Sequence, residues 1–424
     1  MTAGLLLAGT LPRLLPPEPP GLAGHTARYG PPPSGLSDRQ RDALIAEVGR
    51  AGLTGRGGAG FPTARKLAAV AAGHAPVVVA NGTEGEPASV KDRVLMACSP
   101  HLVLDGAVLA AEITGAAKAV IVVHRDVGDI IDEAVAERVR ARADRVRLEV
   151  RTAAEGFVAG QASAVVQWVQ RGVPAPTATP PRLAERGLRG APTLVQNVET
   201  LAHLALIARY GASWFRSAGT PAEPGSMLVT VLGAVRRPAV LEVEIGMPVG
   251  EVLELAGGAS APPQALLLGG YFGTWVDAAE AVGLPFSSAG LADLGAGPGA
   301  GLIAALPAGA CGLAETARVV RYLAGESAGQ CGPCRFGLPA IAGEVERLAD
   351  GRGADPGLLQ RWLGQVDGRG GCAHPGGVTG LVRSALRTFG AELGRHAAGR
   401  CSGPAGVLPV PSAGVPPAPP GGGR

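Results

Sequence analysis

Apolar residues change their spacing along the chain in a way that separates three blocks. In the first block, residues 37–215, helix-spaced apolar residues alternate with short continuous apolar runs. Ser37 is expected to cap a helix that continues to about residue 51, and the run at 77–80 predicts a buried strand. Helices are also expected at 100–114 (capped by Ser99, with Pro100 first) and 129–143, and strands at 119–123 and 146–151. Strands separated by helices predict a mostly parallel sheet.

The other two blocks have different patterns. Residues 225–305 begin with two alternating runs around a Gly/Pro turn, which predict a β-hairpin, and continue with a short helix at 249–255. Residues 308–398 are helix-spaced throughout, with short connections that favour antiparallel neighbours in a small bundle. The four helices are expected at 313–324, 338–348, 358–366 and 378–393. The Pro/Gly-rich ends, 1–35 and 399–424, are expected to be disordered.

Composition narrows the class of protein. A net charge of +3 over 424 residues gives no electrostatic case for nucleic-acid binding. No uninterrupted apolar run approaches the roughly 20 residues of a spanning helix. We therefore expect a cytoplasmic protein that reaches a membrane only through a partner. Six cysteines are too few for a disulfide framework in so long a chain, and clustered ones indicate a metal site.

A glycine-rich loop, GRGGAGFPTARK, spans residues 55–66. Its glycines let backbone N–H groups approach a phosphate or a planar ring without Cβ clashes, and Arg56 and Lys66 add positive charge. The loop matches neither the dinucleotide-binding fingerprint nor the Walker A motif. Taken alone, it is equally consistent with a tight turn.

A charged loop, NGTEGEPASVKDR, occupies residues 81–93, directly after the predicted strand at 77–80. Open α/β sheets bind ligands at this carboxyl end of their strands. Glu84 and Glu86 are therefore candidates for hydrogen bonds to a nicotinamide or a ribose. The alternative is a solvated charged loop with no ligand.

Two cysteines lie in GESAGQCGPCRFG, residues 325–337. Cys331 and Cys334 form a C-x-x-C unit, and one more cysteine at position 328 would complete C-x-x-C-x-x-C, the spacing of an iron–sulfur ligand loop. That position holds Ala328. A further cysteine, Cys372, follows 38 positions after Cys334 in another loop.

In combination with APTLVQNVETLA at 191–202, these segments resemble the NADH-binding flavoprotein subunit of respiratory complex I and its relatives in NAD-linked hydrogenases and formate dehydrogenases. The resemblance covers residues 37–395. It implies an α/β FMN-binding domain at 36–218, a β-grasp module of the soluble-ligand-binding (SLBB) type at 225–305, and an all-α four-helix iron–sulfur domain at 308–398. FMN and a 4Fe–4S cluster would be its cofactors, and NAD(H) its substrate.

The resemblance also implies residue roles. Lys66 would face the FMN phosphate, and Asn81 the flavin and nicotinamide, with Glu84 and Glu86 as the catalytic residues. The other cofactor-binding residues would be Gly55, Arg56, Gly57, Gly58, Gly60, Phe61, Phe157, Gly160, Asn197, Glu199 and Thr200, and the cluster ligands Cys331, Cys334 and Cys372.

The chain departs from the family pattern at positions near both cofactors, including Thr83, which occupies an aspartate-like position. Gln161 and Ala162 replace two carboxylates, so FMN binding is better supported than NADH binding and the electron donor can differ. Ala328 replaces the first cluster cysteine, which leaves four outcomes open. The cluster keeps four irons with another fourth ligand (water, His374, Gln330 or Ser327), it is 3Fe–4S, a remote thiol (Cys311 or Cys401) substitutes, or the site is empty.

The function implied is electron transfer: a hydride passes to FMN, and single electrons pass to the C-terminal cluster and then to a ferredoxin-like or 2Fe–2S protein. A membrane reductase would be reached only through that partner. Two alternatives remain: a non-catalytic binding or assembly protein that has lost dinucleotide and cluster, and a flavoprotein fed by a ferredoxin instead of NADH.

Overall fold

A parallel sheet of four strands organises the first part of the chain in the computed structural model, which describes residues 13–17, 21–178, 181–401 and 403–411. The strand order is β3-β2-β1-β4, and every neighbouring pair is parallel. The predicted parallel sheet is therefore confirmed, with one strand, β4, that the pattern did not reveal. The strands are β1 (Val77–Gly82), β2 (Lys118–Val123), β3 (Arg147–Thr152) and β4 (Thr193–Asn197).

Successive residues of these strands face opposite layers of helices, as the period of two requires. Val78 and Ile121 pack in the main core with α5 and α8, whereas Val79 and Val120 pack on the other face with α7. The central helix α5 is buried along its whole length, which explains its continuous apolar sequence. The helices are α2 (Asp38–Ala51), α3 (Thr63–Ala71), α4 (Lys91–Cys98), α5 (Pro100–Thr114), α6 (Gly128–Ala141), α7 (Ala162–Arg171) and α8 (Val198–Phe215).

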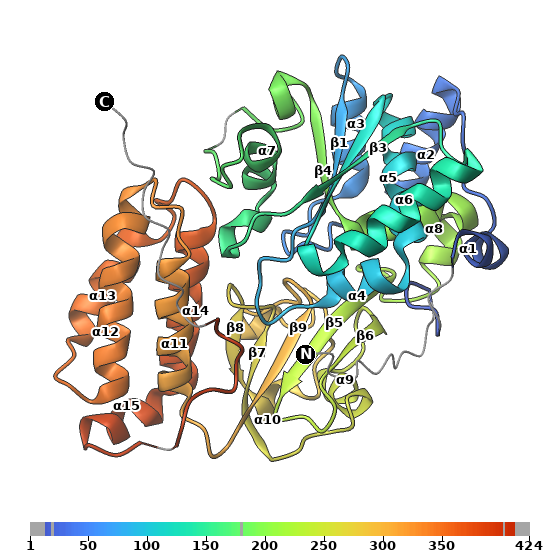
Figure 1. Cartoon of the computed structure of the whole chain (residues 1–424). Coiled ribbons are helices and arrows are strands. Elements are labelled where there is room, and N and C mark those ends of the chain that lie inside the picture. Colours follow the sequence, from blue (N-terminus) through green and yellow to red (C-terminus); the bar gives the residue numbers. More distant parts are fainter. Residues whose placement is uncertain (1–12, 18–20, 179–180, 402, 412–424) are drawn as a thin grey trace, which may run out of the picture.

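A five-stranded mixed sheet follows, in the order β6-β5-β9-β7-β8. The predicted hairpin is the antiparallel pair β5–β6, and the predicted short helix is α9. The sheet lies below the parallel sheet in Figure 1. Its elements are β5 (Ser226–Gly233), β6 (Ala239–Glu244), α9 (Val249–Leu255), β7 (Pro263–Leu268), β8 (Thr274–Asp277), α10 (Ala278–Ala281) and β9 (Leu302–Pro307).

The C-terminal part is a helical bundle beside both sheets (Figure 1). The first three expected helices are present, but the fourth, expected at 378–393, is two helices. The chain leaves the helical conformation at Phe389, where φ is −103° and ψ is 28°, and Phe389 itself is buried. The helices are α11 (Gly312–Gly325), α12 (Leu338–Asp350), α13 (Pro356–Val366), α14 (His374–Thr388) and α15 (Gly390–Ala397).

The N-terminal segment is ordered where the structure describes it, so the expected disorder of 1–35 is wrong for residues 13–17 and 21–35. Leu14 is fully buried, and its backbone N–H donates to Glu242 at 2.8 Å. Ser99 does not cap α5 with its side chain; its hydroxyl donates instead to the carbonyl of Leu14. Residues 1–12 and 18–20 lie outside the described residues.

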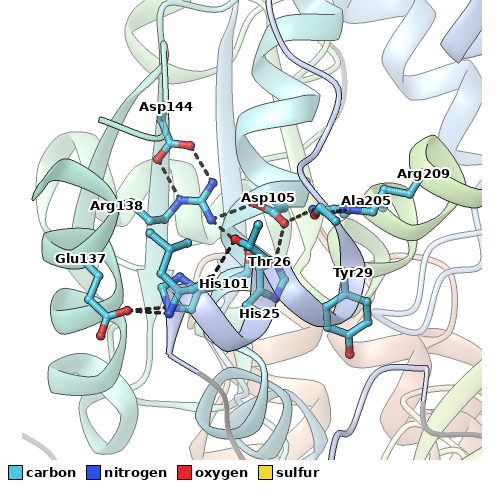
Figure 2. Close-up of polar contacts among 12 residues, drawn as sticks. His25, Thr26, Tyr29, His101, Asp105, Glu137, Arg138, Asp144, Ala205 and Arg209 are labelled. Carbon is cyan, nitrogen blue, oxygen red and sulfur yellow. Dashed lines mark hydrogen bonds and ion pairs between the residues drawn. The ribbon is translucent and has the colours of Figure 1, made fainter. Parts of the chain in front are cut away.

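Helix α1 (Leu22–Tyr29) is held by a buried ion-pair network (Figure 2). Asp105 of α5 lies 2.7 Å from His25 Nε2 and 2.8 Å from Arg138, and it also pairs with Arg209. Burial raises the pKa of Asp105, but the hydrogen bond from His25 and the charges of both arginines outweigh it and lower the pKa to about 2. Distant segments thus meet at one carboxylate, which composition does not reveal.

The C-terminal tail is ordered over 403–411, which corrects the expected disorder of 399–424. The carboxylate of Glu315 accepts hydrogen bonds from the backbone N–H groups of Val407 and Leu408, at 3.2 and 2.7 Å. Leu408 is buried, and Tyr271 donates its hydroxyl to the carbonyl of Pro409 at 2.6 Å. Residues 402 and 412–424 lie outside the described residues.

Among the described residues, no single helix is both long and apolar enough to cross a membrane. Helices α4 and α5 meet the length and composition criteria only as a pair, and the chain bends by 97° between them.

Candidate functional site

A cleft of about 780 Å³ opens at the carboxyl ends of β1 and β4. The chain passes from β1 outward to β2 and β3 and then crosses to β4 on the other side of β1. The boundary between β1 and β4 is therefore the point where strand order reverses, the expected place for a ligand in an open α/β sheet. Asn81 and Asn197, the two predicted asparagines, are register partners there. The predicted residues that line the cleft are Gly55, Arg56, Gly57, Gly58, Gly60, Phe61, Lys66, Asn81, Glu84, Glu86, Phe157, Gly160 and Asn197.

The glycine loop forms one wall of this cleft. Gly55 donates its backbone N–H to the carbonyl of Phe61 at 3.0 Å, which closes the loop. Gly58 has a φ of +102° and Gly60 a φ of +60°, conformations that a side chain disfavours. A Cβ on Gly57 would lie 3.4 Å from Cβ of Asn197. The loop thus presents bare backbone to the cleft.

The two basic residues of the loop have different roles. Lys66 lines the cleft, contacts Val195 O and Gln196 Oε1 at 3.5 Å, and pairs with no carboxylate of the described residues; burial lowers its pKa. A partly buried cation of this kind suits a phosphate. The Arg56 guanidinium instead donates to Thr54 and to the carbonyls of Pro224 and Ser226. Its predicted contribution to phosphate binding is therefore not supported.

Glu86 has an uncommitted oxygen. Its Oε2 accepts the backbone N–H of Tyr271 at 2.9 Å, while its Oε1 is buried and has no partner among the described residues. Burial raises the pKa of Glu86 to about 8. Because an unpaired buried carboxylate oxygen is costly, this atom is suited to accept a hydrogen bond from a ligand in the cleft.

Glu84 is engaged in the fold instead. Its carboxylate accepts hydrogen bonds from the Ser89 hydroxyl at 2.7 Å and from the backbone N–H groups of Asp92 and Arg93 at 3.1 and 3.3 Å. These N–H groups belong to the first turn of α4, so Glu84 satisfies donors that the helix leaves free. Burial and the charge of Asp92 raise its pKa. The structure thus separates two glutamates that the sequence made equivalent.

Both asparagines also fix their neighbours. Asn81 donates to the carbonyl of Gly160 at 2.9 Å. Asn197 caps α8 by accepting the backbone N–H of Glu199, and it donates to Asp92 at 2.6 Å. The predicted binding residues Glu199 and Thr200 do not line the cleft. They support it from behind: Glu199 pairs with Lys91 at 2.7 Å, and Thr200 accepts the backbone N–H of Arg56.

The opposite lip comes from the second domain, and sequence reasoning missed it. Glycine-rich turns after β7 and before β9 line the cleft, together with Phe272. The only sequence signal was the density of glycines at 295–301. Lys91 and Asp92 also line the cleft. The lining residues of the second domain are Gly269, Phe272, Gly273, Thr274, Ser288, Gly295, Gly297, Pro298, Gly299 and Ala300.

The cleft extends to the cysteine loops of the bundle. Ala373, next to Cys372, lines it, and Gln161 Nε2 lies 3.7 Å from Cys372 Sγ. Phe157 lies between the two regions and packs on Phe272, with ring centroids 4.7 Å apart. The glycine-loop side and the cysteine side therefore share one wall, to which the start of α7 and the turn before it contribute Phe157, Gln161 and Ala162.

The three predicted cluster thiols come together at the end of α11. Burial raises the pKa of Cys331, but hydrogen bonds from the backbones of Gly371 and Cys334 outweigh it and lower the pKa. Burial and the neighbouring thiols of Cys331 and Cys372 raise the pKa of Cys334 to about 12. Cys334 lies in a single π-helical turn, a feature frequent at functional sites.

These residues fit an iron–sulfur cluster. Three thiols approach from two loops, and the space beside Gly329, Gly332 and Gly371 is open where a Cβ would project. Thiolates are the ligands that such clusters prefer. The cleft likewise fits a flavin nucleotide, since it offers bare backbone, a cation without a carboxylate partner and an unpaired acceptor.

Two of the proposed replacements for the missing fourth ligand are wrong. Cys311 caps the far end of α11, and its Sγ lies close to that of Cys401. The helix has 14 residues and is therefore about 21 Å long, which places both thiols too far from the cluster loop. His374 is not excluded: its Nε2 donates to the carbonyl of Leu323 at 2.7 Å, but its buried Nδ1 has no hydrogen-bond partner among the described residues. Water, His374, Gln330 and Ser327 remain candidates.

Three segments of the chain match known protein families. Residues 48–206 match the Nuo51 FMN-binding domain, residues 228–270 the SLBB domain, and residues 314–396 the NADH-ubiquinone oxidoreductase-F iron–sulfur binding region. One NADH-quinone oxidoreductase F-subunit of Rhizobium meliloti is 30% identical over 381 residues, covering 84% of this chain and 87% of the relative. The chain belongs to the family of NADH-quinone oxidoreductase F-subunits. The family member of Mycobacterium tuberculosis is likewise 30% identical, over 84% of this chain and 85% of that one.

A solved structure shows a similar fold. The chain is similar to one chain of an NAD⁺-reducing [NiFe]-hydrogenase, with a TM-score of 0.78 and 32% identity over 85% of this chain. The match spans 63% of the hydrogenase chain. The expected order of FMN-binding domain, SLBB module and iron–sulfur region is thus confirmed.

Proposed function

We propose that this chain transfers electrons from NADH, through FMN in the cleft, to an iron–sulfur cluster at the end of α11. The observation that carries the proposal is the continuity of the site: one wall joins Lys66 and Glu86 to Gln161, which contacts Cys372. A bound flavin supplies the required chemistry, because it accepts a hydride and releases electrons singly. A ferredoxin-like or 2Fe–2S protein would take the electrons onward.

Different residues of the chain would bind different parts of FMN. Lys66 would neutralise the FMN phosphate, and the backbone of the loop containing Gly57 and Gly58 would lie against the flavin. Glu86 Oε1 would accept a hydrogen bond from an N–H of the flavin or the nicotinamide. Phe157 and its aromatic neighbours exclude water between the cleft and the cysteines.

The acidic residues that would serve the dinucleotide are replaced. Ala162 lines the cleft without a polar side chain, and Gln161 directs its amide to Cys372. We therefore expect lower affinity for NADH than in relatives that keep both carboxylates. A charged hydrogen bond to a ribose hydroxyl contributes about 1.5–3 kcal/mol, roughly a tenfold to hundredfold change in affinity.

A cofactor-free binding protein is the alternative, and two groups argue against it. The cation of Lys66 is partly buried without a carboxylate partner, and the Oε1 of Glu86 is buried without a hydrogen bond among the described residues. Burying these two groups costs free energy unless a ligand pairs with the Lys66 cation and donates a hydrogen bond to Glu86.

The test is the flavin content of the anaerobically purified chain and of its variants. Lys66→Ala should weaken FMN binding about tenfold to hundredfold, because the phosphate loses its charged partner. Arg65→Ala is the matched control, since Arg65 is exposed, adjacent, and outside the cleft. Gly58→Val should also lose FMN, because φ at this position is +102°. A wild-type chain that binds no FMN would overturn the proposal. Unchanged FMN affinity in Lys66→Ala would overturn only the assignment of Lys66 to the FMN phosphate.

A further inference from the structure

A second group of metal-ligand side chains lies at the opposite end of α11 from the cluster cysteines. Cys311, Glu392, His396 and Cys401 each offer one ligand atom, and the four atoms all lie within 4.8 Å of one another. Cys311 caps α11, Glu392 and His396 lie one turn apart on α15, and Cys401 begins the tail. Helix α15 is at the lower end of the bundle in Figure 1.

His396 is oriented as a ligand would be. Its Nδ1 hydrogen-bonds to the carbonyl of Ala349, so Nδ1 carries the proton and Nε2 keeps its lone pair. Nε2 lies 3.2 Å from Cys311 Sγ and 3.4 Å from the Glu392 carboxylate. A backbone carbonyl that fixes the tautomer of a histidine in this way is the usual outer contact of metal-binding imidazoles.

The donor set and its surroundings favour one small cation over a cluster. Tetrahedral zinc sites combine cysteine, histidine and carboxylate ligands, with metal–ligand bonds of about 2.0–2.3 Å that place the ligand atoms within about 4 Å of each other. Cys311, Glu392 and His396 are buried, and Cys401 is the exposed member. Glu392 also pairs with Arg395 at 2.7 Å, which offsets part of the negative charge that two thiolates and a carboxylate bring.

We propose that Cys311, Glu392, His396 and Cys401 bind a single zinc ion that fastens the C-terminal tail to the bundle. Cys311 lies at the start of α11 and the cluster loop follows its end, about 21 Å away along the helix, so the site is separate from the cluster. The ion would be structural, because four protein ligands leave no position open for substrate.

The position of the site explains what the ion would hold. The described part of the tail, residues 403–411, starts beside α11: Cys311 donates its backbone N–H to the carbonyl of Pro404 at 3.1 Å. The tail then passes Glu315 and reaches Tyr271, whose ring stacks parallel to Phe157 with centroids 6.4 Å apart. Zinc at the start of the tail would thus fix a segment that ends against the wall of the flavin cleft.

The test measures zinc and iron together by mass spectrometry on the full-length chain, purified with FMN and cluster in place. The wild type should hold about one zinc per chain. Cys401→Ser and His396→Gln should each bring zinc to background and leave iron and FMN unchanged. Cys98→Ser is the matched control, because Cys98 is a free, partly buried cysteine far from both sites, and it should keep the zinc.

Cobalt gives a second readout that does not depend on activity. Cobalt(II) bound by two thiolates in a tetrahedral site should add absorption bands that Cys401→Ser lacks, while the Cys98→Ser control retains them. Any of three results overturns the proposal: no zinc in the wild type, a Cys311–Cys401 disulfide in peptides from non-reduced protein, or zinc that persists in both ligand variants. Iron in place of zinc at these residues would refute the choice of metal.

Discussion

The two ends of α11 carry sulfur ligands in contrasting arrangements. At its C-terminal end, Cys331, Cys334 and Cys372 approach from two loops with open space beside three glycines. At its N-terminal end, Cys311 and Cys401 stand with a histidine and a carboxylate, all four ligand atoms within 4.8 Å. The first arrangement leaves room for a polynuclear cluster and lacks one ligand, whereas the second is proposed to close around a single ion.

The two kinds of site require different separations of their ligand atoms. A cluster interposes several irons and sulfides between its thiolates, so the thiolates stay apart. A zinc ion draws four ligand atoms to within about 4 Å of each other. Ala328 is the missing member at the first end, and no member is missing at the second.

The largest expected effect is complete and selective loss of iron. Cys334→Ser removes one of three remaining cluster thiolates, so the chain should lose nearly all of its iron and the broad visible absorption of the cluster, while the zinc of the opposite end remains. Measuring the iron and zinc contents of Cys334→Ser and Cys401→Ser side by side tests whether each variant loses only one metal. Parallel loss of both metals in either variant would mean that the two sites are not independent.

The next largest expected effect is a gain in NADH affinity at the cleft, close to Cys372. Ala162→Glu places a carboxylate back on the cleft wall and should strengthen NADH binding about tenfold to hundredfold. Flavin bleaching on titration with NADH under anaerobic conditions measures the affinity. Gln167→Glu adds the same charge on the same helix outside the cleft, and it should leave the affinity unchanged. Tight NADH binding by the wild type at low micromolar concentration would contradict the weakening ascribed to Ala162.

A smaller effect is the gain of one iron. Ala328→Cys supplies a thiol at the C-x-x-C-x-x-C spacing, so after identical air exposure the variant should hold about four irons per cluster and the parent about three or fewer. Iron content and electron paramagnetic resonance spectra distinguish the two forms. Ala328→Val, which adds bulk at the same position without a ligand atom, should behave as the parent does. Equal, stable four-iron content in parent and variant would show that another group already completes the cluster.

The smallest effect is a change in cluster potential. Gln161 donates an N–H to Cys372 Sγ, and such bonds stabilise the more negative, reduced cluster. Gln161→Leu should lower the potential by roughly 40 mV, since a hydrogen bond is worth about 1 kcal/mol and a one-electron couple shifts about 59 mV per tenfold change. A spectroscopic redox titration measures it, with Gln167→Leu as the control. An unchanged or higher potential in Gln161→Leu would show that the hydrogen bond from Gln161 does not raise the cluster potential.

Sequence reasoning identified elements whose stability is local. The helix after Ser37 follows from its capping residue. The strand that begins at Val77 and the buried helix that begins at Pro100 follow from apolar spacing, which a chain carries in any context. It missed β4, whose pairing with β1 joins residues far apart in the chain. It also predicted disorder for the Pro-rich ends, because composition does not show that the backbone N–H groups of Leu14 and Leu408 donate to the carboxylates of Glu242 and Glu315.

The sequence by itself determined the family and the order of the domains, and it identified the glycine loop and the C-x-x-C unit, since these depend on residue types at short, fixed spacings. The three thiols remain its prediction for the cluster ligands. Only the tertiary structure decided that Glu86 keeps an oxygen without a partner among the described residues while Glu84 caps α4, and that the guanidinium of Arg56 is bound by backbone carbonyls. It alone brought Cys311 to Cys401. These outcomes depend on which distant groups come within about 3–4 Å, and such distances are set by packing, because hydrogen bonds and metal bonds act only over that range.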